Sequence, residues 1–271
     1  MLLNAALSNQ YLMCEALSMS ALHISRIRSE GVEMYRQEAV SLQAQALSLF
    51  NAKMPGVTPE DSSAVVIFAT LLGLHALADT VSAHEANADG FLDKFVTYLN
   101  LHRGVRIFTG QLWDLLKASS MSNLLNDAEA TFRSVDTTSP NEANELIGHL
   151  YGLFEREKDE SESKLACIEA LENLRLVLQI VLAQENVPDQ QKLSLIWSWP
   201  VMLTGVFTNL LMERRPEALI ILCHYAVLLH HRRQLWFVGD AGRLLIEAIT
   251  RFLGTYWRRW LEWPNLMLDQ D

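Results

Sequence analysis

The sequence predicts an all-α fold in the form of a single compact domain of about ten helices. Half of the 271 residues are hydrophobic, yet only 12 are glycine and 7 are proline. The apolar stretches are long, leucine-rich and spaced with the period of a helix, whereas strands are short and β-branched. The length allows a sizeable core for one domain spanning 1–271, and the charged run at 155–163 is a weak internal boundary.

Two amphipathic helices are predicted at the N-terminus. The second, over 30–53, is closed by Pro55 and Gly56. In the first, NQYLMCEALSMSALHISRIR at 9–28, helical spacing places five residues on one face: Leu12, Ala16, Met19, His23 and Ile27.

A helix start follows at Thr58–Asp61, where a capping residue precedes a proline and two acidic residues. The run that it opens, 64–78, is apolar on almost all sides and is therefore expected to be central. This run has about 15 residues, whereas a membrane span needs roughly 20. We therefore expect no membrane span, and the N-terminus has no pattern of a secretory signal.

The rest of the chain alternates between helices and breaks. Helices are expected at 91–109 and 112–117, and the polar stretch 119–144 is expected to hold only short helical pieces. A strong helix is expected at 167–184, and prolines then separate three further elements (Pro188, Pro200 and Pro216). A late helix at 240–253 is ended by Gly254.

Net charge and cysteine spacing exclude several function classes. The net charge of −10 argues against direct binding of nucleic acid, because that requires a basic surface. The three cysteines, Cys14, Cys167 and Cys223, are far apart and cannot form a zinc cluster. We expect a reduced, intracellular protein without a metal site and without a cofactor.

Six of the seven tryptophans lie between positions 197 and 263. Trp257, Trp260 and Trp263 recur at every third position and are expected to share one helix face. Such rings fill a core, wall a pocket for an apolar ligand, or form the interface of a homodimer. The sequence leaves these three alternatives open.

Histidines provide the few candidates for chemistry. His75 and Asp79 are four residues apart, so they are either a base with its orienting carboxylate or a local structural pair. His224 and His231 share a helix face, but no third metal ligand accompanies them. The sequence contains none of the common phosphate-binding, metalloprotease or serine-hydrolase motifs.

Three ordered stretches carry a resemblance to a known family. They are YLMCEALSMSALHIS at 11–25, RPEALIILCHYAVLLHHRRQLWFVG at 215–239 and GRLLIEAITRFLGTYWRRWLEWP at 242–264. With these stretches the chain resembles the C-terminal regulatory domain of fungal-specific transcription factors of the six-cysteine zinc-cluster class. Within that class it is most similar to the sterol-uptake control regulators, and the likeness is weakest over 119–160.

The resemblance implies an all-helical domain that binds a sterol or a terpenoid-like molecule in a hydrophobic pocket among its C-terminal helices. It also implies a protein that is held in the cytoplasm with its ligand and enters the nucleus to activate genes without it. Carried over by position, the ligand-binding residues are Trp197, Met202, Phe207, Leu211, His224, Tyr225, Leu228, His231, Trp236, Phe237, Gly239 and Gly242.

The chain departs from the family in two ways. The family's zinc-cluster region has no counterpart in these residues, and Asp240 and Ala241 stand where the family usually has a Gly-Trp pair in a corner after the long helix. The chain is therefore either the regulatory half of a regulator or a stand-alone relative repurposed as an enzyme of cyclase or isomerase type. The enzyme alternative has five candidate acid–base residues: His75, Asp79, His224, Tyr225 and Asp240.

Overall fold

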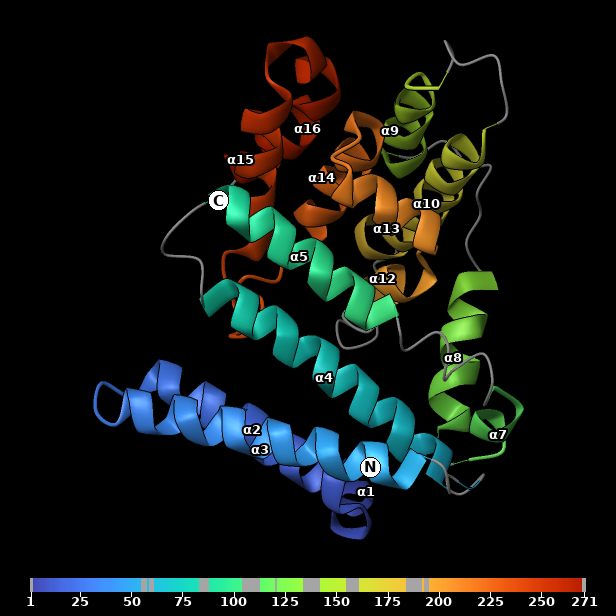
Figure 1. The fold of residues 1–271 in the computed structure, drawn as a ribbon. Coiled ribbons are helices and arrows are strands. Elements are labelled where there is room, and N and C mark those ends of the chain that lie inside the picture. Colours follow the sequence, from blue (N-terminus) through green and yellow to red (C-terminus); the bar gives the residue numbers. More distant parts are fainter. Residues whose placement is uncertain are drawn as a thin grey trace. The chain divides into compact units, whose positions relative to one another are not determined.

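The structure is a computed structural model, and it describes residues 2–54, 58, 61–82, 88–103, 113–119, 121–133, 142–154, 161–183, 192 and 195–269. These residues form fourteen α-helices, one π-helical turn and one 3-10 turn, with no strand among them (Figure 1). The prediction of an all-α fold is thus confirmed.

The chain forms two compact units by the density of its internal contacts. Unit 1 comprises Met1–Ala76 and Gly104–Asn126, and unit 2 comprises Leu77–Arg103 and Asp127–Asp271. This division does not fall at 155–163, of which residues 155–160 lie outside the described residues. The elements are α1 (Leu2–Ser8), α2 (Gln10–Ile27), α3 (Val32–Lys53), α4 (Ser62–Ser82), α5 (Ala88–Arg103), α7 (Trp113–Lys117), α8 (Ser122–Arg133), α9 (Glu142–Tyr151), α10 (Glu162–Leu178), η4 (Gln179–Ala183), α12 (Ser198–Met202), α13 (Gly205–Met212), α14 (Pro216–His230), α15 (Ala241–Leu253), η5 (Thr255–Trp257) and α16 (Arg258–Leu268).

In unit 1, α2 and α3 pack side by side along most of their length (Figure 1). Tyr11 of α2 meets Phe50 and Phe68 edge-on, with ring centroids 5.4 and 5.3 Å away. The face predicted for α2 is partly wrong, since Ile27 is 67% exposed. The buried face instead includes polar residues that hydrophobic spacing does not detect, such as Ser18, whose hydroxyl donates to the Ala39 carbonyl at 2.6 Å.

Hydrogen bonds join Thr58 and Asp61 at the predicted helix start, of which residues 59 and 60 lie outside the described residues. One carboxylate oxygen of Asp61 accepts from the Thr58 backbone N–H at 2.9 Å and from the Thr58 hydroxyl at 3.0 Å. These bonds, together with Lys53 at 3.1 Å, hold the pKa of the Asp61 carboxyl below its ordinary value. The helix begins at the next residue, Ser62.

α4 is longer than the apolar run in the sequence indicates. It has 21 residues, and by length and composition it is, among the described helices, a candidate for crossing a membrane. The core helix of a soluble protein meets the same criteria, and half of this apolar window is buried. Val65 and Phe68 of α4 belong to the hydrophobic core of unit 1, together with Leu12 of α2.

In unit 2, α14 is the central helix. All thirteen residues from Ala218 to His230 are buried, and α10, α13, α15 and α16 pack against it (Figure 1). Pro216 occupies the first turn, where its missing N–H leaves no hydrogen bond unmade. A helix buried on every side has no polar face, which explains its uniformly apolar sequence.

Two glycines fix the corner between α14 and α15. Gly239 has a φ of +45°, and Gly242 lies inside α15, where an added Cβ would come within 2.3 Å of the His230 backbone nitrogen. Gly242 therefore permits a close approach of two helices.

The described cysteines are all reduced and buried. Cys14 lies in unit 1, whereas Cys167 and Cys223 lie in unit 2. Burial raises the pKa of the Cys223 thiol far above its ordinary value.

Candidate ligand site

Five of the twelve predicted ligand residues fall into two aromatic clusters of unit 2. The inner aromatic cluster is Trp199, Phe207 and Tyr225, all fully buried. The Tyr225 ring stacks on Trp199 with centroids 4.3 Å apart, and Phe207 meets Trp199 edge-on at 6.1 Å. The indole N–H of Trp199 donates to the Ala170 carbonyl at 2.9 Å. Trp199 is not among the predicted ligand residues, although it lies two positions after Trp197 in the sequence WSWP.

The outer aromatic cluster is Trp197, Trp236 and Phe237, all half-buried. Phe237 lies between the two indoles, with both ring centroids 5.8 Å away. Trp197 directly precedes α12, and the other two rings come from the turns after α14, so the fold brings together residues about forty positions apart. Half-buried aromatic rings expose apolar area to a ligand and lose little side-chain entropy when the ligand binds. Both properties favour the binding of an apolar molecule.

His224 is a packed core residue. Its Nδ1–H donates to the Ile220 carbonyl at 2.8 Å, and its ring lies parallel to Trp263 at 5.6 Å. Burial lowers the pKa of His224 to about 4, so the imidazole is neutral near pH 7. His231, the other histidine on this predicted face, is exposed.

Buried neutral histidines make stability depend on pH. The pKa of His102 is also lowered to about 4 by burial, whereas an unfolded histidine has a pKa of about 6.5. Between these values the unfolded chain binds more protons, so the free energy of unfolding is highest above pH 6.5 and falls as the pH falls towards 4. We expect a loss of about 1.4 kcal/mol per pH unit for each of the two residues.

Urea denaturation at several pH values checks this expectation. His224→Phe keeps a ring against Trp263 and removes one titrating group, so the pH dependence should become shallower. His231→Gln, at an exposed position, is the matched control and should leave it unchanged. A His224→Phe variant with the wild-type pH dependence would contradict the assignment.

The other predicted lining residues differ in accessibility. Leu211 and Leu228 are buried, and Met202 and Gly239 are half-buried. All of these residues lie in unit 2, and whether they line a ligand stays a prediction.

The predicted acid–base residues occupy several different environments. His75 is buried, and its Nδ1 lies 3.0 Å from the buried carboxylate of Glu15 on α2. Asp79 is exposed, and Asp240 is exposed with its carboxylate 2.9 Å from the Arg243 guanidinium. His75 thus has an orienting carboxylate, Glu15, that spacing in the sequence does not reveal.

The C-terminal tryptophans do not form one continuous free face. Trp263 stacks on His224, while Trp260 is buried against His149 of α9, with the two ring centroids 4.4 Å apart. Trp257 lies in the 3-10 turn before α16 and is half-buried. Two of the three rings are therefore used for packing within unit 2.

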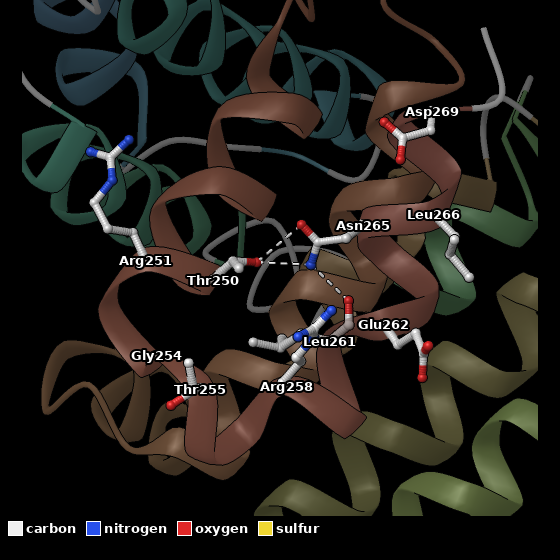
Figure 2. Close-up of a pocket in the computed structure, with 10 residues that line it drawn as sticks. All are labelled: Thr250, Arg251, Gly254, Thr255, Arg258, Leu261, Glu262, Asn265, Leu266 and Asp269. Carbon is white, nitrogen blue, oxygen red and sulfur yellow. Dashed lines mark hydrogen bonds between the residues drawn. The ribbon is translucent and has the colours of Figure 1, made fainter.

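A groove of 540 Å³ lies between the end of α15 and α16 (Figure 2). Two of its lining residues are joined by a hydrogen bond, which the Asn265 amide donates to the Thr250 hydroxyl at 3.0 Å. Most of its exposed lining is apolar, and Arg251, Arg258 and Glu262 add charged groups. None of the residues that the sequence predicts for a hydrophobic ligand lines this groove.

No family model matches the chain. The chain is 23% identical over 263 residues to a protein of Gibberella zeae described as a Zn(2)-C6 fungal-type transcription factor. The match covers 94% of this chain and 52% of that protein, so the chain spans about half the length of this relative. Almost the whole chain is thus similar to a part of a Zn(2)-C6 fungal-type transcription factor, which supports a relationship to that family.

Proposed function

We propose that the chain is the regulatory region of a fungal transcription regulator and that it senses a hydrophobic small molecule of the sterol or terpenoid class. The observation that carries the proposal is the match along 94% of the chain to a Zn(2)-C6 fungal-type transcription factor. The protein would act in the nucleus and be retained in the cytoplasm while its ligand is bound. The net charge of −10 is consistent with DNA being contacted by another region or another protein.

The outer aromatic cluster supports the ligand part of the proposal. Trp197, Trp236 and Phe237 form a partly accessible apolar wall next to a tightly packed core. A rigid polycyclic molecule buries much apolar area against such rings without ordering many rotatable bonds. Sterols have a large apolar area and few rotatable bonds, so they fit this description.

A reporter assay tests the proposal. The full chain is fused to an unrelated sequence-specific DNA-binding module in a fungal host, and reporter transcription is measured with and without an inhibitor of sterol synthesis. We expect transcription to rise on sterol depletion and to fall when ergosterol is supplied. Transcription that stays at the level of the DNA-binding module alone under both conditions would contradict the proposal.

A substitution in the outer aromatic cluster links the response to binding. Phe237→Ala should weaken sterol binding by the purified chain about 10-fold, because it removes the ring between the two indoles. In the reporter assay the variant should stay active at sterol levels that silence the wild type. Tyr256→Ala, which removes a ring that is 75% exposed and outside the cluster, is the matched control and should behave like the wild type.

A further inference from the structure

Three buried side-chain atoms of α5 have no hydrogen-bond partner among the described residues. Two of them, the hydroxyl of Tyr98 and the Nδ1 of His102, lie one helical turn apart on fully buried side chains, and the third is the Nε of Arg103. The side chains of Tyr98 and His102 are each 1% exposed, and their ring centroids are 5.6 Å apart. Buried polar groups in proteins are nearly always paired, so two adjacent unpaired groups indicate a partner from outside the protein chain.

The protonation states define what that partner must offer. Burial raises the pKa of the Tyr98 hydroxyl far above its ordinary value, so the hydroxyl keeps its proton and donates. His102 is neutral near pH 7, and its hydrogen bond to the backbone of Trp197 uses the other ring nitrogen. His102 Nδ1 is therefore a bare acceptor. The pair presents one donor and one acceptor.

Trp197 connects this pair to the outer aromatic cluster. Its backbone forms a hydrogen bond with His102, and its ring packs on Phe237. Tyr225, the neighbouring hydroxyl on α14, lies 3.4 Å from the Ile196 carbonyl and so already has an acceptor. The unpaired groups are thus on α5, and not on the residues of α14 that the sequence nominates.

We propose that Tyr98 and His102 form the polar anchor for a single hydroxyl group on the hydrophobic ligand. The ligand hydroxyl accepts a hydrogen bond from Tyr98 and donates one to His102 Nδ1, while its apolar body lies against the outer aromatic cluster. A hydroxyl satisfies both groups, whereas a ketone satisfies only Tyr98 and a carboxylate has no proton for Nδ1. This inference rests on the proposed function and names the chemistry of the same site.

Three fluorescent probes that differ at one atom test the anchor. The dissociation constants of dehydroergosterol, its 3-keto analogue and its 3-deoxy analogue are measured by energy transfer from tryptophan of the purified full chain. We expect the alcohol to bind about 10-fold more tightly than the ketone and up to about 100-fold more tightly than the deoxy compound.

The variant Tyr98→Phe tests whether the preference for the alcohol comes from the Tyr98 hydroxyl. The variant should lose about 10-fold in affinity for the alcohol and nothing for the deoxy compound, while its melting temperature without ligand is unchanged or higher. Tyr11→Phe is the matched control, because Tyr11 also has a buried hydroxyl without a partner but lies in unit 1. It should show the wild-type affinities.

The outcomes separate the two proposals. If none of the three probes binds even at probe concentrations well above micromolar, the proposed function fails and the anchor fails with it. If all three bind the wild type equally, the anchor alone is overturned, and this comparison needs no variant. Weakening of all three probes to the same degree by Tyr98→Phe would show a packing role and would also overturn the anchor.

Discussion

Gly242→Ala should destabilise unit 2 by about 3 kcal/mol or more. The added methyl group would lie 2.3 Å from the His230 nitrogen, 2.5 Å from the Ala226 carbonyl oxygen and 2.7 Å from the His230 Cα. These three atoms belong to the backbone of α14, which is buried from Ala218 to His230 and cannot move without disturbing the core. The two helices must therefore separate or the variant must unfold.

Tryptophan fluorescence in urea measures this effect, because six of the seven tryptophans lie at or after Trp197 and hence in unit 2. Gly148→Ala on α9 is the matched control, since a methyl group there meets nothing within 4 Å. Alanine favours a helix over glycine by up to about 1 kcal/mol, so the control should be as stable as the wild type or more so. A Gly242→Ala variant with wild-type stability would mean that α15 does not approach α14 this closely.

His75→Leu should destabilise unit 1 by about 3 kcal/mol or more. The substitution leaves the Glu15 carboxylate, which is fully buried, without the imidazole 3.0 Å from it. The second carboxylate oxygen of Glu15 already lacks a hydrogen-bond partner among the described residues, so water or rearrangement must satisfy the whole group. Far-UV circular dichroism during urea denaturation measures the change.

The double variant Glu15→Leu/His75→Leu separates loss of the pair from loss of packing. Two leucines replace two buried polar groups with apolar ones of similar volume, so the double variant should recover most of the stability lost by His75→Leu. If the double variant is less stable than either single variant, the pair is not an isolated buried interaction.

Local rules in the sequence predict the helices well. Pro216 and the run after it define α14, and Thr58 with Asp61 marks the start of α4 by hydrogen bonds that those residue types are known to form. Periodicity fails on α2, because the buried face carries Glu15 and Ser18, whose partners come from other helices. Apolar spacing cannot identify a buried polar residue that is satisfied at long range.

The candidate site is harder to predict for the same reason. Trp236 and Phe237 are adjacent in sequence, but Trp197 joins them only through the fold. Tyr98 and His102 lie about a hundred residues earlier, on a helix whose sequence reads as an ordinary amphipathic one. Their importance comes from hydrogen bonds that are not made, and a sequence pattern does not report an unmade bond.

The burial of all three described cysteines sets how the protein responds to oxidants. Sulfenic acid forms from an exposed thiolate, and burial both blocks access to the sulfur and favours the protonated thiol, as at Cys223. Peroxide thus meets no cysteine thiol at the surface of either unit while both are folded, although the thioethers of Met34 and Met212 are exposed. Oxidation of a cysteine therefore requires that the unit that buries it opens first.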